Sequence, residues 1–249
     1  ASTYAYPDAA TDEPNAALFA RDDLTIRGEG MLSVTGNDQN GIVSKNDLVI
    51  ESGTIVVKAE NNGVRGKNSV TVLGGTITIN AGNDGIQSDN TEDAAKGYVL
   101  IAGGTLNIVA VHDGVQAQTS LAVSGGTVNI QSGGGYTTES YWAEESYKGL
   151  KAAGMVTVTG GEIAVNSRDD AIHAGTTVKV SGGSLSLMSR DDGIHSDGTV
   201  SITGGAVDIA VCYEGIEGTV VNIEGGDISM LAADDGINAV VLEGIEEGA

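Results

Sequence analysis

The sequence predicts an all-β fold, a parallel β-helix of about nine coils of 22 residues, on three observations. The first is a repeated motif, of which Arg190-Asp191-Asp192-Gly193-Ile194 is one copy. Its glycine, replaced once by alanine, keeps intervals of 22, 22, 29, 35, 22, 22, 22 and 21 residues through Gly41, Gly63, Gly85, Gly114, Gly149, Ala171, Gly193, Gly215 and Gly236. The second is a Gly-Gly pair with the same period, from Gly74-Gly75 to Gly225-Gly226. The third is a strict alternation of apolar residues. A fixed period of this length is typical of a solenoid.

Each repeat contains the apolar pattern of three short strands. Val178 and Val180 precede one Gly-Gly pair, and Leu185 and Leu187 follow it. Alternation with a period of two indicates strands, and the Gly-Gly pair suits the corner between them. A third strand is indicated by the apolar residue after the repeated glycine: Ile42, Val64, Ile86, Val115, Leu150, Ile172, Ile194, Ile216 and Ile237. No helical periodicity competes, and the period excludes the nine-residue calcium β-roll.

The repeat is expected to form one domain over residues 23–249. Residues 1–22 are expected to be an N-terminal cap or leader, with residues 16–20 as a short apolar turn over the first coil. Two coils carry insertions, of 7 residues between Gly85 and Gly104 and of 13 residues between Gly126 and Gly149. The chain ends inside a tenth coil, so we expect the natural protein to continue beyond residue 249.

Composition narrows the possible partners. The 249 residues carry a formal net charge of −22. So acidic a chain argues against nucleic acid and anionic membranes as direct partners, and it favours cations and neutral or cation-bridged ligands. No apolar run reaches membrane-spanning length, no signal-peptide pattern is present, and the single cysteine, Cys212, permits no internal disulfide.

Acidic residues form a column along the expected coils. The residue before the repeated glycine is Asn40, Asn62, Asp84, Asp113, Lys148, Asp170, Asp192, Glu214 and Asp235 in turn. Carboxylates on adjacent strands would lie about 4.8 Å apart, where each like-charge pair costs about 3 kcal/mol at an effective dielectric constant near 20. Hard oxygen donors in this number suit Ca²⁺, which we expect to offset the repulsion. The alternative is that Asp and Asn only form turns before glycine, with Arg168 and Arg190 as partners.

A second polar column follows the third strand's apolar residue and contains Lys151, His173 and His195. These side chains are expected to face solvent beside the acids and to contact a ligand. A zinc site on the two histidines is an alternative, although they lack the usual local spacing of zinc ligands.

The longer insertion concentrates aromatic residues, among them Tyr136, Tyr141 and Trp142. Aromatic faces stack on the apolar faces of sugar rings, and loops on a rigid scaffold often carry binding residues. These three residues are therefore expected to bind a carbohydrate. The alternative is that the aromatic side chains form a small satellite core against the rod.

The pairing of Gly182-Gly183 with Asp191-Asp192-Gly193-Ile194, and of Gly225-Gly226 with Asp234-Asp235-Gly236-Ile237, resembles a known family. It is similar to the clostridial cellulose- and pectin-binding β-helix proteins. The resemblance implies a right-handed parallel β-helix similar to pectate lyases, bound calcium, secretion or cell-surface display, and affinity for cellulose-like and acidic polysaccharides. The calcium ligands it implies are Asp169, Asp170, Asp191, Asp192, Asp234 and Asp235, with Asp84 and Asp113 in weaker copies and Glu214 in place of Asp.

Three functions are compatible with these patterns. The first is a non-catalytic, calcium-dependent polysaccharide-binding protein. The second is a calcium-dependent polysaccharide lyase with Lys151 as the base, although the chain lacks the clustered Arg and Lys that would stabilise an enolate. The third is a structural or adhesive cell-surface protein. The first is the leading hypothesis, and the protein is expected to be non-enzymatic.

Overall fold

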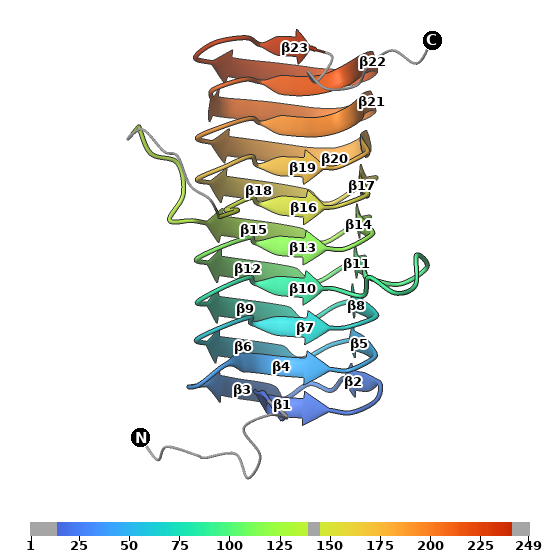
Figure 1. Ribbon diagram of the computed structural model, residues 1–249, viewed down its shortest axis with the longest axis vertical. Coiled ribbons are helices and arrows are strands. Elements are labelled where there is room, and N and C mark those ends of the chain that lie inside the picture. Colours follow the sequence, from blue (N-terminus) through green and yellow to red (C-terminus); the bar gives the residue numbers. More distant parts are fainter. Residues whose placement is uncertain (1–13, 139–144, 241–249) are drawn as a thin grey trace.

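The chain forms a rod of stacked β-coils, as Figure 1 shows for the computed structural model. The structure describes residues 14–138 and 145–240. These residues contain 23 strands and no helix, and every strand pairing among them is parallel. They make nine coils and the first strand of a tenth, which confirms the predicted parallel β-solenoid of 22-residue coils. The right-handed sense implied by the family resemblance stays a prediction. Within these residues no helix is long and apolar enough to cross a membrane.

Three sheets run the length of the rod. The short-strand sheet contains β1 (Ala16–Ala20), β4 (Asn40–Ser44), β7 (Val64–Gly66), β10 (Ile86–Ser88), β13 (Val115–Ala117), β16 (Leu150–Ala152) and β19 (Ile172–Ala174). The second sheet contains β2 (Leu24–Ile26), β5 (Asp47–Ile50), β8 (Ser69–Val72), β11 (Tyr98–Ile101), β14 (Ser120–Val123) and β17 (Met155–Val158). The third sheet contains β3 (Met31–Gly36), β6 (Thr54–Ala59), β9 (Thr76–Ala81), β12 (Thr105–Ala110), β15 (Thr127–Ser132) and β18 (Glu162–Ser167).

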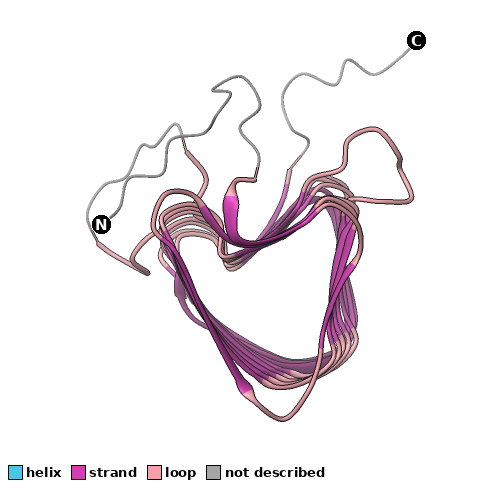
Figure 2. Cartoon of the chain, turned by 90° about the horizontal axis from the view of Figure 1, so that it is seen from below, coloured by secondary structure: helices cyan, strands magenta, loops and turns pink. Residues whose placement is uncertain are grey.

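In the last coils the strands continue around the corners. They are β20 (Thr177–Ser189), β21 (Ile194–Cys212) and β22 (Ile216–Ala232), followed by β23 (Ile237–Ala239) on the short-strand sheet. Viewed along its axis, the rod has three strand-lined sides joined by turns (Figure 2). Stacked apolar side chains fill the interior, and the predicted column from Ile42 to Ile216 is fully buried.

The solenoid begins earlier than the sequence predicts. Residues 16–20 form β1 and not a separate apolar turn, and β1 pairs with β4 so that Leu18 lies opposite Ile42. The boundary expected at residue 23 therefore moves to Ala16. The reason is that Ala16 and Ala17 stand where later coils have Asn or Asp followed by Gly. Because the repeated glycine is missing here, the period of the glycines does not reveal this strand.

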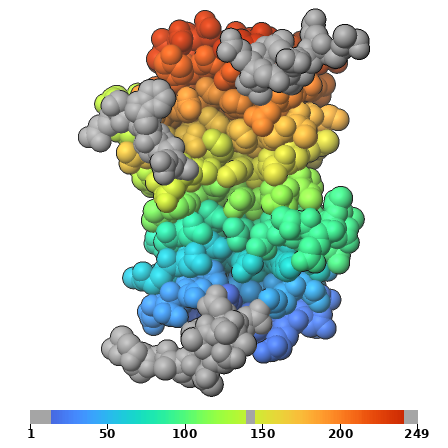
Figure 3. Space-filling model, in the orientation of Figure 1, coloured from blue at the N-terminus to red at the C-terminus, as the bar shows by residue number. Residues whose placement is uncertain are grey.

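The two insertions lie at opposite edges of the short-strand sheet. Residues 89–97 follow β10, and the longer insertion precedes β16. Because the strands are parallel, one insertion leaves the sheet at its carboxyl edge and the other at its amino edge. Figures 1, 2 and 3 show residues 89–97 projecting from the rod. Tyr141 and Trp142 lie outside the described residues.

The repeated glycine is required by close packing inside each coil. A methyl group added at Gly85 would overlap Cγ2 of Ile108 and come within 2.5 Å of the carbonyl oxygen of Gly114. The one exception is Ala171, which replaces the repeated glycine, and the core residue expected to pack on it is also different. Val165, which packs on Gly149, is replaced by Leu187 in the coil of Ala171. Leucine is not branched at Cβ, so it leaves space for the alanine methyl group.

We expect Gly85→Ala to lower the free energy of unfolding by about 1–3 kcal/mol, because the core is overpacked at this point. Adding Ile108→Leu, which copies the Ala171 and Leu187 pair, should recover part of the loss. Gly30→Ala is the control, because no atom lies within 4 Å of the added carbon. Urea unfolding midpoints measure the effect. Equal midpoints for the two alanine variants would contradict the packing explanation.

Candidate functional site

The predicted acidic column lies at the amino ends of the short strands, and most of it is buried. Asp84, Asp113, Asp170 and Asp192 are between 2% and 4% exposed. Lys148 and Glu214 are half-buried, and Asp235 at the end of the rod is exposed. Burial of so many carboxyl groups requires that each has hydrogen-bonding or charged partners.

In five members of the column, Asn40, Asn62, Asp84, Asp113 and Asp170, one side-chain oxygen binds the backbone of the next coil. The backbone N–H of Asp84 donates to Oδ1 of Asn62 at 3.1 Å, and that of Asp113 donates to Oδ1 of Asp84 at 3.1 Å. The same bond joins Lys148 to Asp113 at 2.8 Å and Asp192 to Asp170 at 3.1 Å. Asn and Asp both supply this Oδ1 acceptor, so the column first of all holds the coils in register. This inter-coil role differs from the turn-forming alternative considered for the column, which named Arg168 and Arg190 as partners of the acids.

The second carboxylate oxygen has a partner in the neighbouring polar column. Oδ2 of Asp84 accepts from Gln87 at 2.9 Å, and Oδ2 of Asp113 accepts from Nζ of Lys151 at 3.0 Å. Oδ2 of Asp170 and of Asp192 lie 3.0 and 2.7 Å from Nδ1 of His173 and of His195. The predicted ligand-contacting residues Lys151, His173 and His195 are therefore also the partners of buried acids.

Lys148, which interrupts the acidic column, places a cation among its neighbours. Its Nζ lies 2.7 Å from Oδ1 of Asp169 and 2.9 Å from Oδ2 of Asp170. Burial alone would lower the pKa of Lys148, but the charges of Asp170 and Asp169 raise it above its ordinary value. Burial would likewise raise the pKa of Asp170, but the hydrogen bond from His173 and the charge of Lys148 hold it below the usual range. Part of the charge that calcium was expected to neutralise is thus neutralised by this lysine.

One cluster retains carboxylates suited to a metal ion. Oxygen atoms of Asp169, Asp170 and Asp191 lie within 4.8 Å of one another, and Asp191 is exposed. Reduced hydration, together with repulsion from Asp170 and Asp169, raises the pKa of Asp191 to about 6. Hard oxygen donors of this kind suit Ca²⁺, but Nζ of Lys148 already pairs with Asp169 and Asp170, so a calcium ion there would have to displace this ammonium group.

Acids also crowd together near the end of the rod. Donor atoms of Asp192, His195 and Glu217 lie within 4.8 Å of one another. Burial and neighbouring carboxyl groups raise the pKa values of Asp192, Glu214 and Glu217. Glu214 accepts hydrogen bonds of 3.0 and 3.1 Å from Asn238. Asp234 and Asp235 of the last repeat are exposed.

The longer insertion is anchored to two faces of the rod. On one side the N–H of Tyr136 donates to Oδ1 of Asn166 at 2.6 Å, and Tyr136 is half-buried. On the other side Oγ of Ser146 donates to Asp113 at 2.7 Å and accepts from Lys151 at 3.0 Å. The insertion therefore connects the acidic column with the third sheet.

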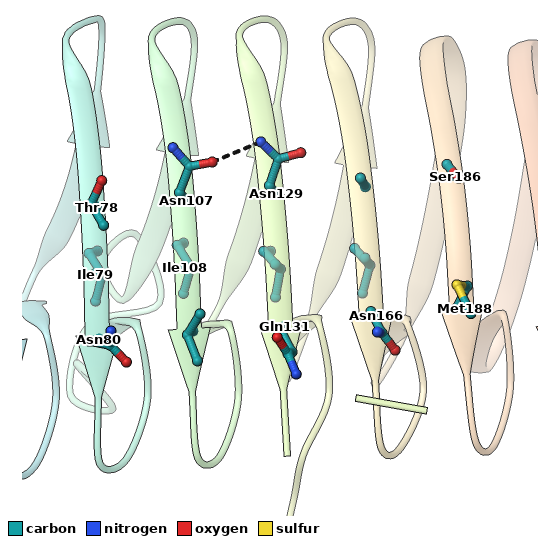
Figure 4. A pocket seen from close by; sticks show the side chains of 14 residues that line it. Thr78, Ile79, Asn80, Asn107, Ile108, Asn129, Gln131, Asn166, Ser186 and Met188 are labelled. Carbon is teal, nitrogen blue, oxygen red and sulfur yellow. Dashed lines mark hydrogen bonds between the residues drawn. The ribbon is translucent and has the colours of Figure 1, made fainter. Parts of the chain in front are cut away.

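The third sheet carries a trough that the sequence reasoning missed (Figure 4). It has a volume of about 380 Å³ and crosses β9, β12, β15, β18 and β20. Its polar lining consists of Thr78, Asn80, Asn107, Asn129, Gln131, Asn166 and Ser186. Val109 and Met188 are among its apolar residues, and no charged residue lines it. Nδ2 of Asn129 donates to Oδ1 of Asn107 at 3.0 Å, which fixes both amides. A listing of the outward-facing residues of each third strand could have revealed this row.

Comparison with known proteins assigns the chain to a family. A family model described as "Carbohydrate-binding domain-containing protein" matches residues 1–193 and 172–215, so the chain belongs to this family. A protein of the same description from Acetivibrio thermocellus is 48% identical over 59 residues, which are 24% of this chain and 21% of that protein. The chain thus matches about a fifth of that relative's length.

A solved structure is also similar to this chain. It is described as the structure of the polysaccharide lyase-like protein from C. thermocellum, gadolinium derivative. The sequence identity is 30%, the match covers 90% of this chain and 60% of that chain, and the TM-score is 0.43.

The burial of Asp84 in the acidic column predicts how the stability of the protein depends on pH. Burial and repulsion from Asp113 raise the pKa of Asp84 from 3.8 to about 7. Between these two values the folded state binds more protons than the unfolded state, so stability falls as pH rises through this window. Asp84→Asn keeps the Oδ1 acceptor, as Asn62 does in the preceding coil, and removes the charge. Relative to the wild type, this variant should become more stable by about 2–4 kcal/mol between pH 4 and pH 8.

Urea unfolding at a series of pH values, with a chelator present throughout, measures this difference. Asp38→Asn, which removes one charge at an exposed position, is the control and should show no such trend. A difference between Asp84→Asn and wild type that stays constant from pH 4 to pH 8 would rule out the raised pKa.

Proposed function

We propose that this chain is a non-catalytic, calcium-dependent binding module for plant cell-wall polysaccharides, both cellulose-like and pectic. The observation that carries the proposal is the uncharged trough, lined by apolar, amide and hydroxyl side chains, on an otherwise acidic rod, in a member of a carbohydrate-binding family. Polymers of this kind lie outside the cell, so we also propose that the protein is secreted or displayed at the cell surface.

The trough suits a neutral glycan chain lying along the rod. Its amide and hydroxyl groups both donate and accept hydrogen bonds, as sugar hydroxyls require. The side chains repeat with the strand spacing of about 4.8 Å, so five strands present a row roughly 19 Å long. Val109 and Met188 offer apolar contact to sugar ring faces. Since Tyr136 is bound to Asn166 at the edge of the trough, this aromatic residue would lie near the same ligand.

A bound calcium ion would allow this acidic protein to bind an acidic glycan. Asp169, Asp170 and Asp191 supply hard oxygen donors, and a calcium ion held there would offset their repulsion and attract uronate carboxylates. Lys151, His173 and His195 lie in one column of the short-strand sheet and are the candidate contacts to such a chain. A rod with net charge −22 would otherwise repel a polyanion.

Lys151, the candidate base of the lyase alternative, takes part in two structural contacts. Its Nζ donates to Asp113 and to Ser146, both at 3.0 Å. These contacts support a role in anchoring the insertion and positioning a ligand.

For the acidic ligand, we expect retention on polygalacturonate to require calcium and to be abolished by a chelator. Asp191→Asn should weaken calcium-dependent retention roughly tenfold, since it removes one charged ligand. Asp38→Asn is the matched control, because it removes an exposed charge elsewhere. Ultraviolet absorbance of the same samples reports unsaturated sugar product. Retention that is unaffected by the chelator would remove calcium from the function, and growing absorbance would make the protein a lyase.

For the neutral ligand, we expect Asn129→Asp to lower retention on cellulose roughly tenfold. The substitution places a charge in the trough, removes the amide donor to Asn107, and costs about the free energy of one or two hydrogen bonds. Asn222→Asp, at an exposed position of β22, is the matched control. Calcium-dependent retention on polygalacturonate should be unchanged in both variants. Equal cellulose retention by both variants would exclude the trough as the binding surface.

A further inference from the structure

Two histidines are stacked on neighbouring coils. His173 of β19 and His195 of β21 are register partners, and their ring centroids lie 4.9 Å apart with an interplanar angle of 39°. Their side chains are 18% and 19% exposed. Both side chains are therefore largely covered but still reach solvent.

The inner nitrogen of each ring is fixed by a buried carboxylate. Nδ1 of His173 lies 3.0 Å from Asp170, and Nδ1 of His195 lies 2.7 Å from Asp192. Asp170 is itself held by the backbone N–H of Asp192. A carboxylate on one ring nitrogen fixes the orientation of a metal-binding imidazole and makes its other nitrogen a better ligand.

The outer nitrogens of both rings face the same carboxylate. Oδ1 of Asp197 lies 3.4 Å from Nε2 of His195 and 3.9 Å from Nε2 of His173. Ligand atoms held at about 2.0–2.1 Å by a tetrahedral zinc ion lie about 3.3 Å from one another. The separation of 3.4 Å is near this value and that of 3.9 Å is longer, so rotations about the side-chain bonds would have to bring the ligand atoms together around the ion.

We propose that His173, His195 and Asp197 form a binding site for a transition-metal ion of the zinc class. The two Nε2 atoms and one oxygen of Asp197 are the ligands, and the fourth position is open to water or to an oxygen of a bound molecule. Imidazole donors favour zinc over calcium, which prefers oxygen. Its ligand atoms differ from those of the proposed oxygen-donor site around Asp191, while Asp170 borders both sites. The zinc proposal does not depend on the proposed function.

Neighbouring charges are compatible with a cation at this position. Glu217 lies 3.6 Å from Nδ1 of His195. Lys148 bonds Asp169 and Asp170 on the inner side, whereas the proposed ligand atoms face outward. Lys151 is the register partner of His173 in the preceding coil, and its Nζ is bonded to Asp113 and Ser146.

The chain itself supplies a matched substitution for the test. Gln87 and Gln116 occupy the same column as the two histidines, and Gln87 donates to Oδ2 of Asp84 at 2.9 Å. His173→Gln and His195→Gln should therefore keep the hydrogen bond to the buried acid and lose the metal-binding nitrogen. Asp197→Asn is a further variant, at a side chain that is 47% exposed, so its folding is not at risk.

Equilibrium dialysis against Zn²⁺ in excess Ca²⁺, with metal content measured by mass spectrometry, tests the site. We expect one zinc ion per chain in the wild type and affinity more than about tenfold weaker in each of the three variants. Asp191→Asn, which alters the oxygen-donor cluster, should bind zinc as the wild type does. Co²⁺ should give the intense visible absorption of a tetrahedral site in the wild type only.

Two results would overturn the proposal. One is zinc binding by His195→Gln and Asp197→Asn with wild-type affinity, which would place the ion on other carboxylates. The other is no zinc bound by the wild type in dialysis. Circular dichroism of each variant confirms that a loss of binding is not a loss of fold.

Discussion

The structure depends on the hydrogen bond from a backbone N–H of one coil to the Oδ1 atom of an Asn or Asp in the coil before it. This bond joins successive coils from Asn40 to Lys148 and again from Asp170 to Asp192, with distances between 2.8 and 3.2 Å. It is interrupted at Asp170, whose N–H bonds Oδ1 of Asp169 because the preceding coil has Lys148 at this position. It satisfies buried donors at a corner where the ladder of strand pairing is interrupted, and unpaired buried donors would be costly. Because it requires one side-chain type at one position of each coil, it also creates the column of acids.

The column in turn determines the chemistry of the adjoining surface. Buried carboxylates need partners, and the chain supplies Gln87, Lys151, His173 and His195 at the position three residues along or on the next coil. These partners form the outward row of the short-strand sheet, so the groups that neutralise the interior are also the groups presented to a ligand. The two proposed cation sites, around Asp191 and at Asp197, both adjoin this network of acids and partners. The uncharged trough on the third sheet stands apart from this network.

Much of the fold could be predicted from the sequence, because glycine and apolar residues recur wherever coils pack closely. Strand β1 was not predicted, because Ala16 and Ala17 stand in place of the Asn-Gly or Asp-Gly pair that marks the other coils. Leu18 nevertheless occupies the core position of the repeat. The sequence also showed that Asp170 and Asp192 stack, but not that one oxygen of Asp170 binds the next backbone or that Lys148 folds onto Asp169. These contacts depend on side-chain direction, which spacing does not encode. The trough was hidden because Thr, Asn, Gln and Ser alternate there without a fixed motif.

The central claim is that most column carboxylates are already occupied by the protein's own donors, so that calcium binds where they are in excess. Calorimetric titration of calcium into chelator-treated protein tests this most directly. We predict a single strong site whose calcium affinity Asp191→Asn lowers roughly tenfold. Saturation at roughly one ion for every Asp-Asp-Gly repeat would show instead that calcium, and not the hydrogen-bonded network, neutralises the column.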